Sequence, residues 1–337
     1  MDFLSDNAAG VHPAVLAALA QAAPACADAY DADPWSRRLE AIVSDLFGRP
    51  ARVFPVPTGT AANALALAAC VPPWGGVVAH THAHVERDEA GALGFFGHGA
   101  SLLLVPGAHG KLAIPELDAA LARRRADVHQ VQPAALTLTN ATEAGTTYAP
   151  DEVRALARWG HARGLRVHLD GARLANAIVH HGARPADMVA EVDLLSLGCV
   201  KTGGMTAEAV VVFAPDLAAT LPVRRKRAGL MPSKGRLMAA QILGLLESGA
   251  WLETARRANA GAQALADALP AKRRLHPVEA NMVFAHLEAH EKAALRAAGF
   301  RFHDWEVDGP AAARFVVRWD QEDSAIEALA RRFRALP

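Results

Sequence analysis

The fold is decided by the stretch LRVHLDGAR at positions 165–173, which is followed by DLLSL at 193–197 and GCVKTGG at 198–204. Both apolar runs are short and bounded by polar residues or glycine, a pattern consistent with buried strands of a parallel sheet. Parallel strands bring their carboxyl ends to one edge of the sheet, where α/β proteins bind ligands. We therefore expect a buried acid, Asp170, a paired arginine, Arg173, and a lysine, Lys201, to meet at that edge.

This set of side chains matches the requirements of pyridoxal phosphate chemistry. An aspartate keeps the ring nitrogen protonated, and a lysine amine forms a Schiff base with the cofactor. Arg173 could bind a substrate carboxylate through two parallel hydrogen bonds. In the alternative interpretation, Asp170 lies in a solvated turn with a surface ion pair and Lys201 is an ordinary surface lysine. The strand-end position of Asp170 and the apolar segments around Lys201 favour the functional interpretation.

Short β-branched or leucine-rich runs alternate with alanine-rich stretches along most of the chain, which is typical of an α/β fold. Strands are expected at Arg52–Val56, Val77–His80, Ser101–Val105, Ala134–Thr139, Leu165–Leu169, Asp193–Leu197 and Ala209–Phe213. Helices are expected at Pro13–Ala22, Pro34–Phe47, Ala61–Ala69, Pro115–Arg123, Pro150–Arg163 and Pro185–Val189. Several of these helices have proline in the first turn, where its missing N–H group costs nothing.

The pattern changes after Pro222. Two long helices are expected next, at Ser233–Glu247 and Trp251–Ala268, followed by strands at Met282–His286 and Arg314–Arg318. We therefore predict a large cofactor-binding domain over residues 1–235, to whose active site the N-terminal segment contributes, and a small C-terminal α/β domain over residues 236–337.

Composition narrows the classes of partner. The chain has 337 residues, of which 52% are hydrophobic and 21% charged, and this composition is typical of an ordered globular protein. Its 35 basic and 35 acidic residues balance, so no net field favours nucleic acid or a membrane surface. The three cysteines are too few and too widely spaced for a disulfide framework. Together with the absence of a secretory signal pattern, they lead us to expect a cytoplasmic protein.

A candidate phosphate site lies at TGTAAN, positions 58–63, between an expected strand and an expected helix. Gly59 lets the backbone approach an anion closely. The free N–H groups and the helix dipole then favour a phosphate, with the Thr60 hydroxyl as a further donor. Taken alone, the same residues are also consistent with a simple turn and a threonine N-cap. The pair Asp170 and Lys201 makes phosphate binding the better interpretation.

Two further groups of residues leave alternatives open. His80, His82 and His84 alternate, and on a strand they would share one face, as a metal site could require. No carboxylate or cysteine at ligand spacing completes such a site, so we expect no metal and instead expect one of these histidines to stack on a cofactor ring. The basic run RRKR at 224–227 is either a solvated face or a contribution from one subunit to the cofactor phosphate of its neighbour.

Taken together, these segments resemble the threonine aldolase family, in the β-eliminating-lyase branch of the fold-type I pyridoxal phosphate enzymes. The resemblance covers most of the chain in collinear order, and its most specific strings are DEAGA at 88–92 and HLDGARL at 168–174. Further matches lie at LSDN (4–7), TGTAAN (58–63), AH (83–84), GKL (110–112), Lys201 and the basic segment near 226. The resemblance implies a mostly parallel central sheet, a smaller C-terminal α/β domain, and a homodimer or homotetramer with its active site at the subunit interface.

The resemblance also implies a role for individual residues. Lys201 would bind the cofactor covalently, Asp170 would pair with the pyridinium nitrogen, and His84 would stack on the ring and assist proton transfer. The phosphate would be bound by Gly59 and Thr60, and by Arg225 and Lys226. The substrate carboxylate would be held by Ser5, Arg173 and Arg314, although Arg318 lies on the same face of the same expected strand.

Three departures from the family pattern concern Thr58, the string NATE at 140–143 and the lysine context GCVKTGG. Thr58 stands where members often have serine, and NATE lacks a second histidine that members often place near the substrate hydroxyl. The sequence around Lys201 resembles that of a subgroup of low-specificity enzymes that act on bulkier β-hydroxy amino acids such as phenylserine.

The implied function is cleavage of the Cα–Cβ bond of a β-hydroxy-α-amino acid to glycine and an aldehyde. A β-eliminating lyase and a non-catalytic regulatory protein on the same fold are the alternatives. A dinucleotide dehydrogenase is disfavoured because no glycine-rich fingerprint follows the first strand.

Overall fold

A seven-stranded sheet forms the centre of the larger part of the molecule in the computed structural model, which describes residues 1–336. Its strand order is β1-β7-β6-β5-β4-β2-β3. All neighbouring pairs from β6 to β3 are parallel, and β7 runs antiparallel to both β6 and β1. The prediction of a mostly parallel central sheet is therefore confirmed. The strands are β1 (Arg52–Val56), β2 (Gly75–His80), β3 (Ser101–Val105), β4 (Gln132–Thr139), β5 (Arg166–Gly171), β6 (Leu194–Leu197) and β7 (Glu208–Val212).

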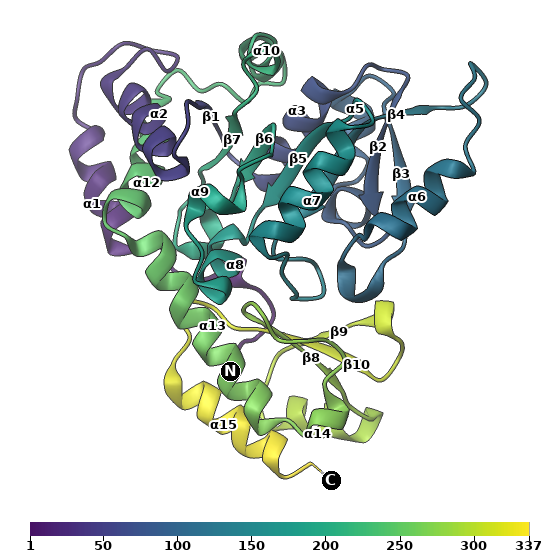
Figure 1. The fold of residues 1–337 in the computed structure, drawn as a ribbon. Helices are drawn as coiled ribbons and strands as arrows, with labels where there is room; N and C mark the ends of the chain where they lie inside the picture. The colour runs from purple at the N-terminus through teal and green to yellow at the C-terminus, as the bar shows by residue number, and fades with distance from the viewer. Residues whose placement is uncertain (337) are drawn as a thin grey trace.

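Helices cover both faces of this sheet (Figure 1). One face packs on α3, whereas α7 and α8 pack on the other. The helices of this part are α1 (Pro13–Ala22), α2 (Pro34–Phe47), α3 (Gly59–Cys70), α4 (His84–Arg87), α5 (Ala92–Phe96), α6 (Ile114–Ala122), α7 (Pro150–His161), α8 (Leu174–His181), α9 (Pro185–Met188), α10 (Pro215–Ala218), α11 (Leu221–Arg227) and α12 (Arg236–Glu247).

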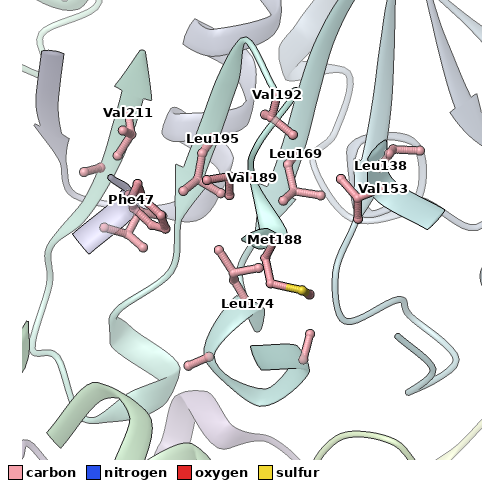
Figure 2. Close-up of a cluster of buried hydrophobic side chains, with 14 of the residues drawn as sticks. Phe47, Leu138, Val153, Leu169, Leu174, Met188, Val189, Val192, Leu195 and Val211 are labelled. Atoms are coloured by element: carbon pink, nitrogen blue, oxygen red, sulfur yellow. The ribbon is translucent and has the colours of Figure 1, made fainter. Parts of the chain in front are cut away.

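Successive strand residues enter opposite layers, as the period of a strand requires. Leu194 belongs to the layer under α3, whereas Leu195 belongs to the layer on the other face. Figure 2 shows the second layer, in which Leu138, Leu169, Leu195 and Val211 come from four different strands. All four side chains are at most 1% exposed.

Local sequence signals explain where several helices begin and end. At α2, the Asp33 carboxylate accepts the backbone N–H of Ser36 at 2.9 Å, and Pro34 occupies the first helical position. The helix ends at Gly48, whose φ of 64° is a left-handed conformation that glycine adopts without strain. These signals allow the bounds of α2 to be predicted from the sequence.

A second, antiparallel sheet has the strand order β8-β10-β9. Its strands are β8 (Met282–His286), β9 (His303–Asp304) and β10 (Ala312–Val316). They pack with α13 (Ala250–Ala268), α14 (Ala289–Ala297) and α15 (Asp323–Arg334). β10 begins two residues earlier than the sequence suggests, because Ala312 pairs with His286 of β8.

The amino terminus lies against this second sheet (Figure 1). The Phe3 ring is fully buried in its core, and the Phe3 carbonyl accepts the N–H of Val316 at 2.8 Å. This anchor places Ser5 and the 3-10 helix η1 (Asp6–Ala8) between the two sheets. The division of the chain at residue 235 stays a prediction: α12 packs on α1 and α2, and α13 contributes residues to both hydrophobic cores.

The carboxyl ends of β4, β5 and β6 align in register. Asp170 lies opposite Thr139 on one side and Ser196 on the other. The turn after β6 then passes so close to the turn after β5 that a Cβ atom at Gly198 would lie 2.5 Å from the Ala172 carbonyl oxygen. Glycine at position 198 thus allows the segment carrying Lys201 to approach the segment carrying Asp170.

No helix within residues 1–336 is long and apolar enough to span a membrane.

Candidate active site

A cavity of about 410 Å³ opens at this sheet edge, between the large sheet and the second sheet. Seven of the predicted site residues line it: Ser5, Gly59, His84, Asp170, Arg173, Lys201 and Arg314. The N-terminal segment therefore contributes to this cavity together with both sheets.

Asp170 is buried at the end of β5, with 3% of its surface exposed. One carboxylate oxygen accepts the backbone N–H of Ala172 at 3.0 Å, and the other accepts the Asn63 amide at 2.9 Å. The surface-turn interpretation of this residue is thus wrong. The predicted pairing of the acid with Arg173 is also not found, because Arg173 binds a different carboxylate.

A hydrogen-bond network connects Asp170 to His84. The Asn63 amide nitrogen also donates to Glu89 at 2.8 Å, and the same Glu89 oxygen lies 2.8 Å from His84 Nδ1. The hydrogen bond to Glu89 raises the pKa of His84, and burial raises the pKa of Glu89. Asn63 and Glu89 were not predicted, although they stand in the two motif strings at 58–63 and 88–92.

Lys201 is half-buried on the short helix η3 (Val200–Thr202), which begins shortly after the end of β6. Two buried side chains hold this segment. The Trp251 indole donates to the Gly198 carbonyl at 3.0 Å, and Glu208 accepts the backbone N–H of Cys199. Burial raises the pKa of Glu208 to about 7, although the nearby Lys201 opposes this shift. The lysine is therefore supported by packed residues from β7 and α13.

The loop 58–60 forms a helix N-terminus. Thr58 is the N-cap of α3, and its side-chain oxygen accepts the N–H of Ala61 at 3.1 Å. The N-cap side chain satisfies the N–H group of Ala61 only. The N–H groups of Gly59 and Thr60 are free to bind a ligand, because the first turn of a helix has no internal acceptors for them. A Cβ atom at Gly59 would meet no atom within 4 Å, so the space beside it is open.

Arg173 is held by the N-terminal segment. Its Nε and Nη2 atoms donate to the two Asp6 carboxylate oxygens at 2.7 and 2.9 Å. The Asn281 amide also donates to Asp6, at 3.0 Å. Burial alone would raise the pKa of Asp6, but Arg173 and Lys201 outweigh burial and lower it. The sequence did not predict Asp6, because its partners lie far away in the chain.

Arg314 and Arg318 differ clearly in their surroundings. Arg314 lines the cavity, its guanidinium lies 4.8 Å from the centre of the Trp305 ring, and burial lowers its pKa to about 10. Its buried Nε atom has no hydrogen-bond partner among residues 1–336. Arg318 follows the end of β10 and donates to Asp320 at 2.9 Å. The cavity thus favours Arg314 as the second carboxylate-binding arginine.

Arg225 and Lys226 do not line this cavity. Arg225 is 1% exposed and forms an ion pair with Asp31, and Lys226 Nζ lies 4.2 Å above the Tyr30 ring. Arg225 instead lines a separate surface cavity of about 880 Å³. Its Nη2 atom is buried and unpaired within the described part of the chain. The interpretation of this run as a solvated face is therefore wrong for Arg225.

The three alternating histidines do not share a strand face. β2 ends at His80, whose Nε2 lies 3.0 Å from the Gly107 carbonyl oxygen, and His84 begins α4. Of these residues, His84 alone lines the cavity. The chain turns away from strand geometry after His80, so the period of two no longer applies.

Pyridoxal phosphate fits the residues at this site. Asp170 offers a buried carboxylate, Lys201 an amine at the same cavity, and the α3 N-terminus offers free N–H groups beside open space. The buried Asn63 Oδ1 atom has no hydrogen-bond partner within the described residues. A buried polar atom normally has such a partner, so this oxygen is available to a bound ligand.

Comparisons with known proteins agree with this geometry. The family model described as beta-eliminating lyase matches residues 2–290. A low specificity L-threonine aldolase from Pseudomonas aeruginosa is 41% identical over 98% of this chain and 96% of its own length. A second, from a Pseudomonas strain, is 38% identical over 99% of this chain and 97% of its own length. The structure of a Leishmania major threonine aldolase superposes with a TM-score of 0.92 at 27% identity, covering 98% of each chain.

Proposed function

The chain belongs to the beta-eliminating lyase family, and from this premise we propose that the cavity around Lys201 and Asp170 is its active site. The protein is a pyridoxal phosphate-dependent lyase. It cleaves the Cα–Cβ bond of β-hydroxy-α-amino acids of the threonine, allo-threonine or phenylserine type, which yields glycine and an aldehyde.

Each residue at the sheet edge has a place in this reaction. When bound, pyridoxal phosphate takes up the electron pair that bond cleavage leaves on the substrate α-carbon. Lys201 would hold the cofactor through its amine and exchange places with the substrate amine. The Asp170 carboxylate would accept a hydrogen bond from the protonated ring nitrogen and so keep it protonated, and Asn63 fixes the orientation of the carboxylate. His84, held by Glu89, would lie against the ring and move protons.

Two arginines and Ser5 would hold the substrate carboxylate. Asp6 occupies the Nε–Nη2 edge of Arg173, so the Nη1–Nη2 edge is the one that can take a carboxylate in a two-pronged contact. Arg314 would contribute from β10. Fixing the carboxylate fixes the rotation about the bond from nitrogen to the α-carbon. The bond to be broken can then be held perpendicular to the ring, an orientation that accelerates cleavage.

A buried acid, an amine and two arginines converge on one cavity, and this convergence is the strongest support for the proposed function. These four groups arrive on β5, the turn after it, η3 and β10, so no local structural need brings them together. A non-catalytic regulatory protein would not require a substrate-binding pair of arginines beside an intact lysine and acid.

We also propose a homo-oligomer, a dimer or a tetramer, in which Arg225 and Lys226 reach the cofactor phosphate of a neighbouring subunit. Gly59 and Thr60 offer backbone and hydroxyl donors but no positive charge, and the buried Nη2 atom of Arg225 lacks a partner within residues 1–336. A cytoplasmic location is proposed as well, supported by the free state of Cys26, Cys70 and Cys199.

Product analysis tests the reaction class. The holoenzyme is incubated with L-threonine, L-allo-threonine or phenylserine, and glycine, aldehyde, ammonia and 2-oxo acid are measured in the same samples. We expect equal amounts of glycine and aldehyde. A 2-oxo acid with ammonia would instead assign the chain to β-elimination, and no product from any of the three would favour the non-catalytic alternative.

A further inference from the structure

Glu143 lies in the loop between β4 and α7 and lines the active-site cavity. One carboxylate oxygen, Oε1, accepts the backbone N–H of His84 at 2.7 Å. The other, Oε2, is buried and has no hydrogen-bond partner among residues 1–336. A buried carboxylate oxygen without a partner is costly and requires an explanation.

The surroundings of Glu143 bring its ionisation close to neutral pH. Burial raises the pKa of Glu143 to about 7, and the negative charge of Asp170 adds to the shift. A general base works best when its pKa lies near the operating pH, because it is then largely ionised and still basic enough to take a proton. Glu143 therefore combines an acceptor oxygen that has no hydrogen-bond partner within residues 1–336, a place in the cavity wall and a suitable basicity.

The other carboxylates near the cavity lack this combination. Both oxygens of Asp170 are engaged, one by Asn63 and the other by the backbone of Ala172. Glu89 also has a buried unpaired oxygen, but it does not line the cavity. Asp88 lines the cavity but is exposed, so water can satisfy its oxygens.

We propose that Glu143 is a further catalytic residue, whose Oε2 atom takes the proton of the substrate β-hydroxyl during carbon–carbon cleavage. This inference deepens the proposed function and rests on it. The carboxylate stands in the NATE string that lacks the family's second histidine, so a different acid–base group serves the substrate hydroxyl in this chain.

The hydroxyl proton moves to Glu143, the hydroxyl oxygen forms a double bond to Cβ, and the Cα–Cβ bond breaks with its electron pair remaining on the Cα side. Cα is then protonated by His84, which moves protons in the proposed function, and glycine is formed. Glu143 returns its proton to His84 through solvent, so the enzyme regains its starting charge.

A comparison of two reactions of one holoenzyme separates catalysis from positioning. Cleavage of threonine requires removal of a hydroxyl proton, whereas exchange of the α-hydrogen of glycine in deuterium oxide involves no hydroxyl. The test variant is Glu143→Gln, whose amide oxygen can still accept the N–H of His84 and whose volume is nearly the same. Retained circular dichroism and visible absorbance of the bound cofactor show that the variant is folded and loaded.

We expect Glu143→Gln to lose about 100-fold or more in kcat/KM for threonine, the usual effect of removing a general base. Glycine exchange should stay at the wild-type rate. The wild-type kcat/KM should rise with pH through about 7, and this rise should be absent in the variant. If Glu143→Gln lost threonine cleavage and glycine exchange to the same extent, Glu143 would only position His84 and would not be the base. Cleavage of threonine at the wild-type rate would overturn the proposal. Loss of the same pH limb in Asp88→Asn instead would transfer the role to Asp88.

A second readout does not depend on activity. Infrared difference titration of the cofactor-free chain should show buried carboxyl groups ionising near pH 7, because Glu143 and Glu208 both have a pKa of about 7. Glu143→Gln should remove one part of this signal, and Glu208→Gln the other. An unchanged titration in Glu143→Gln would contradict the proposed basicity. If the wild type instead made no glycine and aldehyde at all, the proposed function would fail while this titration could still succeed.

Discussion

Replacing Asp6 by asparagine tests how the N-terminal segment supports the active site. The Asp6 carboxylate is 1% exposed and binds Arg173 through two hydrogen bonds. It also accepts the Asn281 amide, which in turn donates to the Val317 carbonyl at 2.9 Å. Asp6→Asn keeps the shape of the side chain but removes its charge, so the half-buried Arg173 guanidinium loses its counterion.

The cost can be estimated from this geometry. Removing one partner of a buried ion pair typically costs about 3–5 kcal/mol. We take about 3 kcal/mol because Arg173 is only half-buried and asparagine can still accept one hydrogen bond. For 337 residues a loss of about 3 kcal/mol lowers Tm by about 4 °C. The contribution of Asp6 to the free energy of unfolding also depends on pH. The pKa of Asp6 is lowered in the folded chain, so its contribution is present above the unfolded pKa and is lost as pH falls through the folded value. The difference between wild type and variant should therefore shrink in acid.

Kinetics should report the same loss, because Arg173 is no longer held against the substrate. We expect KM for threonine to rise roughly tenfold, equivalent to about 1.5 kcal/mol of lost charge-assisted hydrogen bonding. The assays are calorimetric unfolding and steady-state glycine formation with saturating cofactor.

The matched control is Asp187→Asn. Asp187 binds Arg184 with the same two-pronged geometry, at 2.9 and 2.8 Å, but at the exposed start of α9. This variant should keep the wild-type Tm and KM, because exposed ion pairs contribute little to stability. If Asp6→Asn and Asp187→Asn behaved alike, the assignment of Asp6 as the support of Arg173 would be refuted.

Further predictions concern the acid, the second arginine and the basic run. Asp170→Asn should retain the cofactor but lose about 100-fold or more in turnover, since the ring nitrogen loses the charge that stabilises its proton; near-normal glycine formation would place another residue at that nitrogen. Arg314→Lys should raise KM about tenfold because an ammonium cannot make a two-pronged contact, whereas Arg318→Lys, bonded to Asp320 away from the cavity, should keep the wild-type KM. A reversal of that pair would exchange the two assignments. Arg225→Ala should weaken cofactor retention after dialysis without abolishing turnover at saturating cofactor, and light scattering that found an active wild-type monomer would contradict the shared site.

Much of the fold could be predicted from the sequence because its signals are local. Pro13 and Pro34 fix helix starts, and the apolar run before Asp170 is bounded by polar residues and glycine. The direction of β7 could not be predicted, because strand composition does not distinguish parallel from antiparallel pairing. The start of β10 was missed as well, since Ala312 and Ala313 have low β-propensity and join the strand through pairing with β8.

The residues of the candidate site also fall into two groups, those that the local sequence predicts and those that it does not. Asp170 and Lys201 could be placed at one edge because each stands at, or shortly after, the carboxyl end of a parallel strand. The partner of Arg173 could not, because Asp6 reaches it through the packing of Phe3 in the second core. Glu143 could not be identified from the NATE string, because the family comparison there concerns only a missing histidine. Its buried position involves a contact with the backbone of His84, which no local pattern predicts. Contacts between distant segments, which no local pattern encodes, account for these omissions.

Covalent mapping of the cofactor tests whether Lys201 holds it at this sheet edge. Reduction of the holoenzyme with borohydride fixes the cofactor on the amine that holds it, and digestion with mass spectrometry then locates the modified lysine. We predict that the label lies on Lys201, and that Lys201→Ala stays folded but carries no label and forms no glycine from threonine. A label on any other lysine, or glycine formation that survives Lys201→Ala, would contradict the placement of the active site at this sheet edge.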